Sequence, residues 1–164
     1  MKKNLMCLTA VFTLSVAVPS FASEPPPESS TASICPMTKV TENTLKMKPK
    51  PNSSFPVGGI KAPKVSCHDN KEKFKAGYHF KLFVSPDRKQ RIDYLHKPEE
   101  IQAACQNACI EQSKNCKETF AKGDKAKVAM CNAQLHDCMA AHNESHSAVF
   151  KKISDTHCTK YGEP

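Results

Sequence analysis

The sequence is poor in the residues that build a large apolar core. It has no tryptophan, only 7% of its 164 residues are aromatic, and its mean hydropathy is −0.52. A chain of this length is expected to form about one domain, and small domains bury a smaller fraction of their surface than large ones. These absences disfavour a large enzyme fold.

Recognisable catalytic motifs are also missing. The chain contains no glycine-rich phosphate loop, no serine nucleophile elbow, no His-Glu-x-x-His helix and no closely spaced carboxylates in an apolar setting. We therefore predict a protein that is not an enzyme and that carries no cofactor.

Long apolar runs are absent beyond the first 22 residues. Residues 1–22 combine a charged start, an apolar run from Leu5 to Val18 and a small-residue cleavage site ending at Ala22, which is the pattern of a signal peptide. A bilayer span needs about 20 apolar residues, so this run is too short, and no second run of that length follows. The lysine-rich start is typical of a bacterial leader. We predict export to the periplasm or beyond, with no transmembrane segment in the mature chain.

Cysteine, by contrast, is abundant. Of the nine cysteines, Cys7 leaves with the predicted signal peptide and eight remain. An even number at this density is typical of exported proteins in which disulfides replace missing core. We predict that all eight form disulfides, namely Cys35, Cys67, Cys105, Cys109, Cys116, Cys131, Cys138 and Cys158.

Composition divides the mature chain into a lead-in, two modules and a tail. Residues 23–34 are rich in Pro, Ser and Thr and are predicted to be disordered. Residues 35–97 hold fourteen Lys or Arg against five acids, a balance of +9, whereas residues 98–158 hold seven Lys against eight acids, a balance of −1. Residues 159–164 form a short tail. The basic character of the protein therefore belongs to its first module.

The basic module has the pattern of a small, irregular sheet. Apolar and polar residues alternate from Gly77 to Val84, and Ile92 to Leu95 predicts a second strand. Residues 85–88 supply Pro and Asp for a turn between them. Another strand is expected around Val57 to Ile60.

Residues 98–158 switch to a helical pattern. Pro98, followed by two glutamates, suits the start of a helix, and one helical face recurs at steps of three and four from Ile101 to Phe120. Gly123-Asp124 breaks this pattern. A second face then runs from Val128 to Val149 in steps of three and four, which predicts one continuous helix. The two helices are predicted to form an antiparallel hairpin.

The cysteine positions support this hairpin. Residues level with each other in an antiparallel hairpin have position numbers with a constant sum, and both Cys109 with Cys138 and Cys116 with Cys131 give 247. The midpoint falls at the predicted turn. We predict two disulfides here, the alternatives being unbonded core cysteines or a four-thiolate zinc site. The predicted fold class is α+β, a small disulfide-stapled irregular β module followed by a two-helix antiparallel hairpin crosslinked by two disulfides.

This hairpin resembles the coiled-coil-helix-coiled-coil-helix family of mitochondrial import proteins, which join two helices through twin disulfides. The resemblance covers residues 105–138 and is geometric. It departs from the family in having six residues between the cysteines of each helix, a narrower spacing. It implies a helical hairpin, and with a bacterial-type leader it does not imply that family's import or metal-delivery functions.

Four cysteines remain, and they allow three pairings. Cys105 is level with His142, whereas Cys158 lies sixteen residues farther along, about 24 Å in a straight helix. A bond between Cys105 and Cys158 is therefore disfavoured. We favour a bond from each of these two to either Cys35 or Cys67, which would tie the modules together, while a bond within the first module stays open.

Histidine is the other candidate ligand in the helical module. Met139, His142 and His146 lie on adjacent turns of the predicted helix, a set that could hold copper or zinc. The competing interpretation is that His142 is a half-buried histidine of the inner face. We favour that interpretation and predict no metal.

A basic face is the main functional feature of the first module. Its lysines are interleaved with aromatic residues, which suits ligands that carry both negative charge and rings or acyl chains. The competing interpretation is a solvated face that keeps the protein in solution. The candidate residues are Lys61, Lys64, Lys71, Lys73, Lys75, Lys81, Arg88 and Arg91.

These observations predict an exported, non-enzymatic binding or interaction protein. Its partner would be an anionic envelope component, such as a lipid, lipopolysaccharide or cell-wall polymer, or an acidic protein. Nucleic acid is disfavoured because an exported protein seldom meets it. The alternatives are a periplasmic metal-binding or thiol-handling protein, and a secreted inhibitor or effector that acts on a protein partner.

Overall fold

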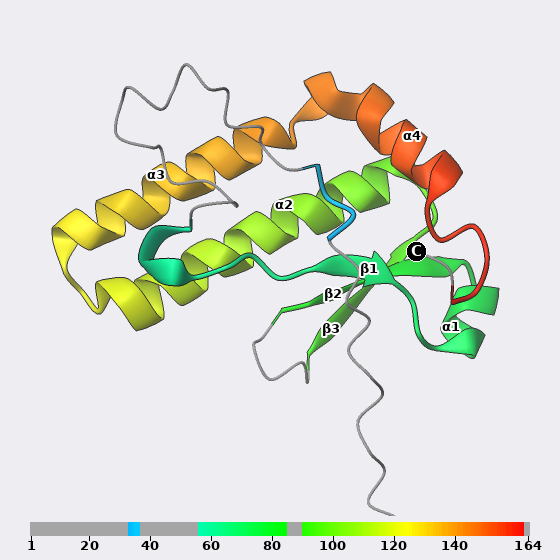
Figure 1. Ribbon diagram of the computed structural model, residues 1–164, viewed down its shortest axis with the longest axis horizontal. Coiled ribbons are helices and arrows are strands. Elements are labelled where there is room, and N and C mark those ends of the chain that lie inside the picture. The colour runs from blue at the N-terminus through cyan, green and yellow to red at the C-terminus, as the bar shows by residue number, and fades with distance from the viewer. Residues whose placement is uncertain (1–32, 37–55, 85–89, 163–164) are drawn as a thin grey trace, which may run out of the picture.

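The computed structural model describes residues 33–36, 56–84 and 90–162 (Figure 1). The predicted signal peptide, residues 1–22, lies outside the described residues, as does most of the predicted lead-in. Arg88 and the predicted turn around it also lie outside them.

Three strands form one antiparallel sheet in the order β1-β2-β3, with β1 at Val65–Cys67, β2 at Tyr78–Phe83 and β3 at Arg91–Leu95. Strand β2 lies within the alternating stretch from Gly77 to Val84, and β3 covers the second predicted strand, Ile92 to Leu95. Phe80 and Leu82 of β2 are fully buried, and they lie opposite Cys67 and Val65 of β1. One face of the sheet is therefore a packing surface.

Two short elements of the basic module, β1 and α1, were not predicted from the sequence. β1 has three residues and α1, Lys71–Lys75, has five, so neither is long enough to show a period. The side chain of Asn70 starts α1 by accepting hydrogen bonds from the N–H groups of Glu72 and Lys73, both at 3.0 Å.

The strand expected around Val57 to Ile60 is wrong. The chain forms a 3-10 turn there instead, η2, Val57–Gly59. Gly58 and Gly59 have φ values of 61° and 75°, a left-handed conformation that a strand excludes. A Cβ atom on Gly58 would also lie 2.5 Å from Cγ of Phe120, so the turn packs closely against the helices.

Helix α2, Pro98–Asn115, lies across the sheet and forms the centre of the molecule (Figure 1). Lys97 before it is extended, as expected for a residue that precedes proline. A π-helical segment, η3, Cys116–Ala121, continues α2 to the hairpin turn. Helix α3, Lys125–Ala141, then returns antiparallel to α2. It is capped by the carboxylate of Asp124, which accepts from the N–H groups of Ala126 and Lys127.

The second helix is not continuous to Val149, in contrast to the prediction. α3 ends at Ala141, and after a short turn, η4, Glu144–His146, a separate helix α4, Ser147–Thr156, folds back along α2. The side chain of Asn143 accepts from the N–H of Ser145 at 3.2 Å, a local bond that competes with helix continuation. The fold-back lets Phe150 and Ile153 enter the main core.

The main core lies between the sheet, α2 and α4. Its fully buried members come from all three layers, and a second, smaller core lies at the hairpin turn around Val57 and Cys116. None of the helices in the described segments combines the length and the apolar character that a membrane-spanning helix needs.

Four disulfides connect these parts. Cys109 is bonded to Cys138 and Cys116 to Cys131, the two pairs that the constant sum predicts. The other bonds join Cys35 to Cys105 and Cys67 to Cys158, which is one of the two arrangements of the favoured hypothesis. Both link the first module to the helices.

Candidate functional site

A cavity of about 190 Å³ lies where α2 and α3 meet two extended segments, residues 33–36 and 61–64. Apolar side chains line it, among them Ala62, Pro63 and Ala108. The Cys35–Cys105 and Cys109–Cys138 disulfides also contribute to its walls. Such a concave, mostly apolar site with a few polar groups is the usual form of a small-molecule site.

Buried glutamines hold the second of these segments against the helices. Gln134 of α3 accepts from the N–H of Val57 at 2.6 Å, and Gln112 of α2 donates to the carbonyl of Ile60 at 2.8 Å. Both side chains are 1% exposed, so these bonds are shielded from water. Residues 61–64 therefore leave η2 on a fixed path past the cavity.

The first segment is held by one disulfide and by strand β1. Cys35 is bonded to Cys105, and the N–H of Ile34 donates to the carbonyl of Val65 at 3.1 Å. Ser33 and Ile34, which the sequence analysis assigned to the disordered lead-in, thus lie beside the sheet.

Lys61 and Lys64 bring positive charge to the cavity. Both line it, both are exposed, and neither has an ion pair within the part of the chain that the structure describes. Their charges are therefore available to a ligand.

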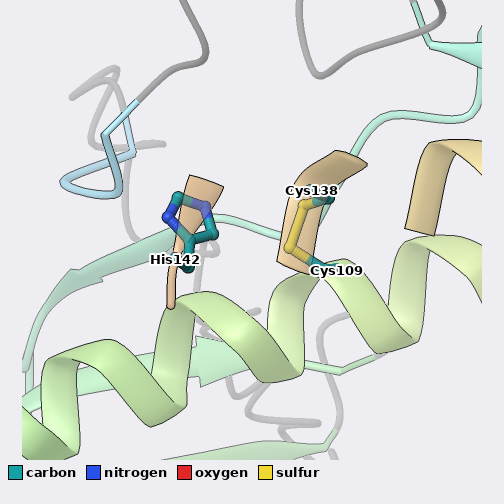
Figure 2. Close-up of side chains that lie close together, drawn as sticks. All are labelled: Cys109, Cys138 and His142. Atoms are coloured by element: carbon teal, nitrogen blue, oxygen red, sulfur yellow. A yellow bond between two sulfur atoms is a disulfide. The ribbon is translucent and has the colours of Figure 1, made fainter. Parts of the chain in front are cut away.

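His142, at the end of α3, is another polar residue of the cavity lining. It is 5% exposed, and its Nδ1 has no hydrogen-bond partner among the described residues. Burial lowers the pKa of His142 below its ordinary value, so the ring is neutral near pH 7. Figure 2 shows this ring beside the Cys109–Cys138 disulfide.

Of the three candidate ligands Met139, His142 and His146, His142 lines the cavity and the other two do not. Nδ1 of His146 contacts Oδ1 of Asn143 at 2.9 Å. Among the described residues, the three potential ligands that lie together are instead Cys109, Cys138 and His142, whose ligand atoms are all within 4.8 Å of one another. The separation of four positions between Cys138 and His142 was a signal for this pair, since such residues are neighbours on a helix.

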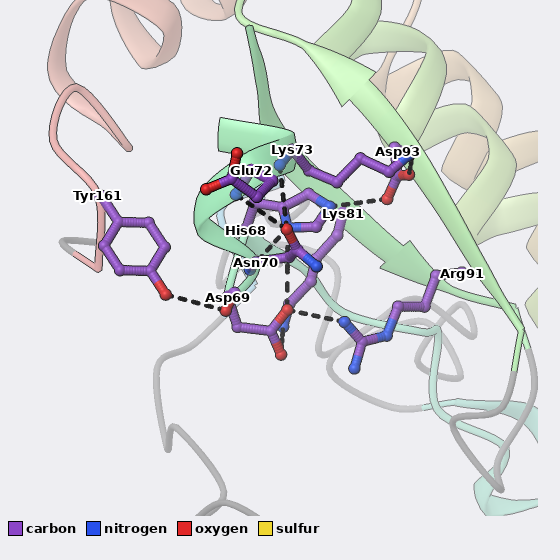
Figure 3. Close-up of polar contacts among 9 residues, drawn as sticks. All are labelled: His68, Asp69, Asn70, Glu72, Lys73, Lys81, Arg91, Asp93 and Tyr161. Atoms are coloured by element: carbon purple, nitrogen blue, oxygen red, sulfur yellow. Dashed lines mark hydrogen bonds and ion pairs between the residues drawn. The ribbon is translucent and has the colours of Figure 1, made fainter. Parts of the chain in front are cut away.

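The predicted basic face is largely neutralised by acids of its own module (Figure 3). Lys81 is buried, 6% exposed, and pairs with Asp69 at 2.7 Å. Arg91 also pairs with Asp69 at 2.7 Å, and Lys73 pairs with Asp93 at 3.3 Å. Lys81, a candidate residue of the basic face, is therefore buried, and Asp69 holds its ammonium group within the fold.

Two further members of the predicted face lie on α1. Lys75 pairs with Glu72 at 3.2 Å between two exposed side chains, whereas exposed Lys71 has no ion pair within the described ranges. Of the predicted basic residues that the structure describes, only Lys61 and Lys64 line the cavity.

We call the ion-paired residues of this face the Asp69 network; they are Asp69 with Lys81 and Arg91, and Asp93 with His68 and Lys73. Its two acids hold the first module together. Burial raises the pKa of Asp69. The hydrogen bond and charge of Lys81, together with the charge of Arg91, lower this pKa by more than burial raises it, so the net pKa is below its ordinary value. The pKa of Asp93 is likewise lowered, because its bonds to His68 and Lys73 outweigh burial.

His68 is a structural member of the same network. Its Nε2 bonds Asp93 at 2.7 Å and its Nδ1 accepts from the N–H of Asn70 at 3.0 Å. With both ring nitrogens engaged, His68 joins Asp93 of β3 to the residue before α1.

No protein-family model matches this chain, and neither the curated proteins nor the solved structures give a significant match.

Proposed function

We propose that this chain is an exported binding protein, not an enzyme, whose cavity takes a small organic anion or the anionic end of a longer amphiphile. The observation that carries the proposal is the pairing of an apolar cavity with two lysines, Lys61 and Lys64, that have no acidic partner in the described segments. The disulfide framework supports export, because such bonds persist in oxidising compartments.

The size of the cavity limits the ligand. Sites for drug-sized molecules usually have about 300–1,000 Å³, whereas this cavity has about 190 Å³. A short acyl chain or a single ring fits such a space, because an apolar cavity of about 150 Å³ holds benzene; we take a short acyl chain as the probe. The lysine charges favour a carboxylate or a phosphate on that chain.

His142 adds a directional contact. A neutral imidazole carries one N–H donor and one acceptor nitrogen, and its unpartnered Nδ1 is buried. An unpaired buried polar atom costs free energy. A ligand oxygen that bonds this ring would remove that cost, which favours ligands with oxygen atoms near their charged end.

Hexanoate, with hexanol as its uncharged counterpart, tests this proposal by titration calorimetry on the chain without residues 1–22. We expect hexanoate to bind more tightly than hexanol. Its affinity should fall as salt rises from about 0.01 M to about 0.15 M, because the Debye length shrinks from about 30 Å to about 8 Å. The double variant Lys61→Glu/Lys64→Glu should weaken hexanoate binding at least fivefold and leave hexanol binding nearly unchanged.

Lys71→Glu/Lys152→Glu is the matched control, because it changes the net charge by the same amount at two exposed lysines elsewhere. It should weaken hexanoate binding by less than twofold. An equal loss of affinity in the two double variants would show that only total charge attracts the anion, and would overturn the proposed site.

A further inference from the structure

Among the described residues, the Cys109–Cys138 disulfide is the one whose two sulfur atoms form a compact donor group with a histidine. The two sulfur atoms and a ring nitrogen of His142 lie within 4.8 Å of one another (Figure 2). Cys109 is 1% exposed, whereas Cys138 is partly exposed, and both line the cavity. A small thiol entering the cavity can therefore reach this bond.

Opening the disulfide would create a zinc-type donor set. Zinc binds cysteine sulfur at about 2.3 Å and histidine nitrogen at about 2.0–2.1 Å in tetrahedral geometry, which places its donors about 3.5–3.8 Å apart. The two sulfurs must separate to reach that spacing, while a ring nitrogen of His142 lies within 4.8 Å of both sulfurs. A neutral imidazole is the protonation state that binds metal.

The rest of the framework is able to keep the donors in place when this bond opens. The Cys116–Cys131 bond joins η3, the continuation of α2, to α3, and each of its cysteines lies seven residues nearer the hairpin turn than Cys109 or Cys138. Both Cys116 and Cys131 are fully buried. Gln106 of α2 also donates to the carbonyl of His142 at 2.8 Å. Cys109, Cys138 and His142 therefore remain on facing helices that are still crosslinked.

We propose that Cys109, Cys138 and His142 form a redox-gated zinc site, closed in the disulfide form and open after reduction by a dithiol. In the first step the dithiol is oxidised to its own disulfide, and its two electrons and two protons convert the Cys109–Cys138 bond into two thiols. In the second step Zn²⁺ displaces both thiol protons and binds the two thiolates and His142. The fourth position of the tetrahedral ion is left for water or an anion from the cavity.

The experiment uses the chain without residues 1–22, with Co²⁺ as a spectroscopic probe that competes with Zn²⁺. Graded dithiothreitol treatment followed by alkylation and peptide mapping should show that Cys109 and Cys138 become free while Cys116 and Cys131, which are both fully buried, stay bonded, with helical circular dichroism retained. After the reductant is removed without air, Co²⁺ should give thiolate charge-transfer absorption. It should bind at least 100-fold more tightly than to the oxidised protein, and Zn²⁺ should displace it.

Variants assign the donors. His142→Ala should weaken Co²⁺ binding to the reduced protein at least tenfold, whereas His136→Ala, at an exposed position on the same helix, should change it less than twofold. Cys109→Ser/Cys138→Ser should abolish the charge-transfer absorption. Opening of all four bonds together with loss of helix, or equal affinity in wild type and His142→Ala, would overturn the proposal.

The proposed zinc site shares His142 and the cavity with the proposed anion site, but the two proposals are tested on different forms of the protein. Hexanoate binding is measured on the oxidised protein, and Co²⁺ binding is measured on the reduced protein without any carboxylate ligand present. Failure of one proposal therefore leaves the other standing.

Discussion

Replacement of Cys67 and Cys158 together by alanine is expected to lower the free energy of unfolding by about 4–5 kcal/mol. This bond has the longest sequence separation of the four, 91 residues, and it fastens β1 to the segment after α4. A crosslink that closes a long loop removes more conformational freedom from the unfolded chain than one that closes a short loop. Urea unfolding followed by circular dichroism measures the loss.

The variant Cys116→Ala/Cys131→Ala provides the comparison. Its bond spans 15 residues, for which the same relation gives about 3 kcal/mol. The variant without the longer crosslink should therefore unfold at lower urea. If Cys116→Ala/Cys131→Ala instead unfolds at the lower urea concentration, packing at the hairpin turn, and not chain entropy, determines how much these bonds stabilise the fold.

Asp69→Asn is expected to lower the free energy of unfolding at pH 7 by about 2–3 kcal/mol. The side chain of Lys81 is 8% exposed, so its ammonium would lose its bonded carboxylate within the fold. Removing one partner of a buried pair costs about 3–5 kcal/mol, and we discount this because Asp69 is 42% exposed. Adding Lys81→Met removes the stranded charge and should restore most of the stability.

The same variant should change the response to acid. The pKa of Asp69 in the folded state is below the ordinary 3.8, so the pair stabilises the fold above that pH and the stabilisation is lost as pH falls through the folded value. The stability difference between wild type and Asp69→Asn should therefore narrow as pH falls below 3.8 and through the lower folded-state pKa of Asp69. Asp93 titrates in both proteins and serves as an internal reference.

Glu72→Gln is the control for a surface pair. Glu72 and Lys75 are 81% and 62% exposed, and exposed pairs contribute about 0–1 kcal/mol. A loss for Asp69→Asn no larger than that for Glu72→Gln would contradict a structural role for the Asp69 network.

The sequence predicts the hairpin well because its signals are local and mutually consistent. The cysteine positions, the turn at Gly123 and the helical steps all indicate the same geometry, and the alternating residues of β2 identify the face that is buried. These patterns arise directly from the periods of helices and strands.

The fold-back of α4 could not be predicted in the same way. Steps of three and four continue through His142 to Val149 whether or not the helix bends, because each of the two helices has the same period. The turn depends on a local bond of Asn143 and on the burial of Phe150 against other layers. Burial of this kind has no signature along the chain.

The cavity and the neutralised basic face could not be predicted from the sequence because both depend on contacts between distant parts of the chain. Lys81 and Asp69 are twelve positions apart and meet only because β2 lies beside the segment that follows β1. The cavity likewise combines Ala62, Ala108 and His142 from three distant parts of the chain. The net charge of a stretch of sequence does not show which of its charges form ion pairs. It also does not show which distant residues meet around a cavity.

The most direct test of the account is nuclear magnetic resonance of the isotope-labelled chain without residues 1–22 during titration with hexanoate. If the cavity is the anion site, the largest chemical-shift changes fall on the methyl groups of Ala62 and Ala108 and on the ring of His142, and they saturate together. Changes that instead centre on α1 and Arg91, or that spread evenly over all exposed lysines without saturation, would contradict it.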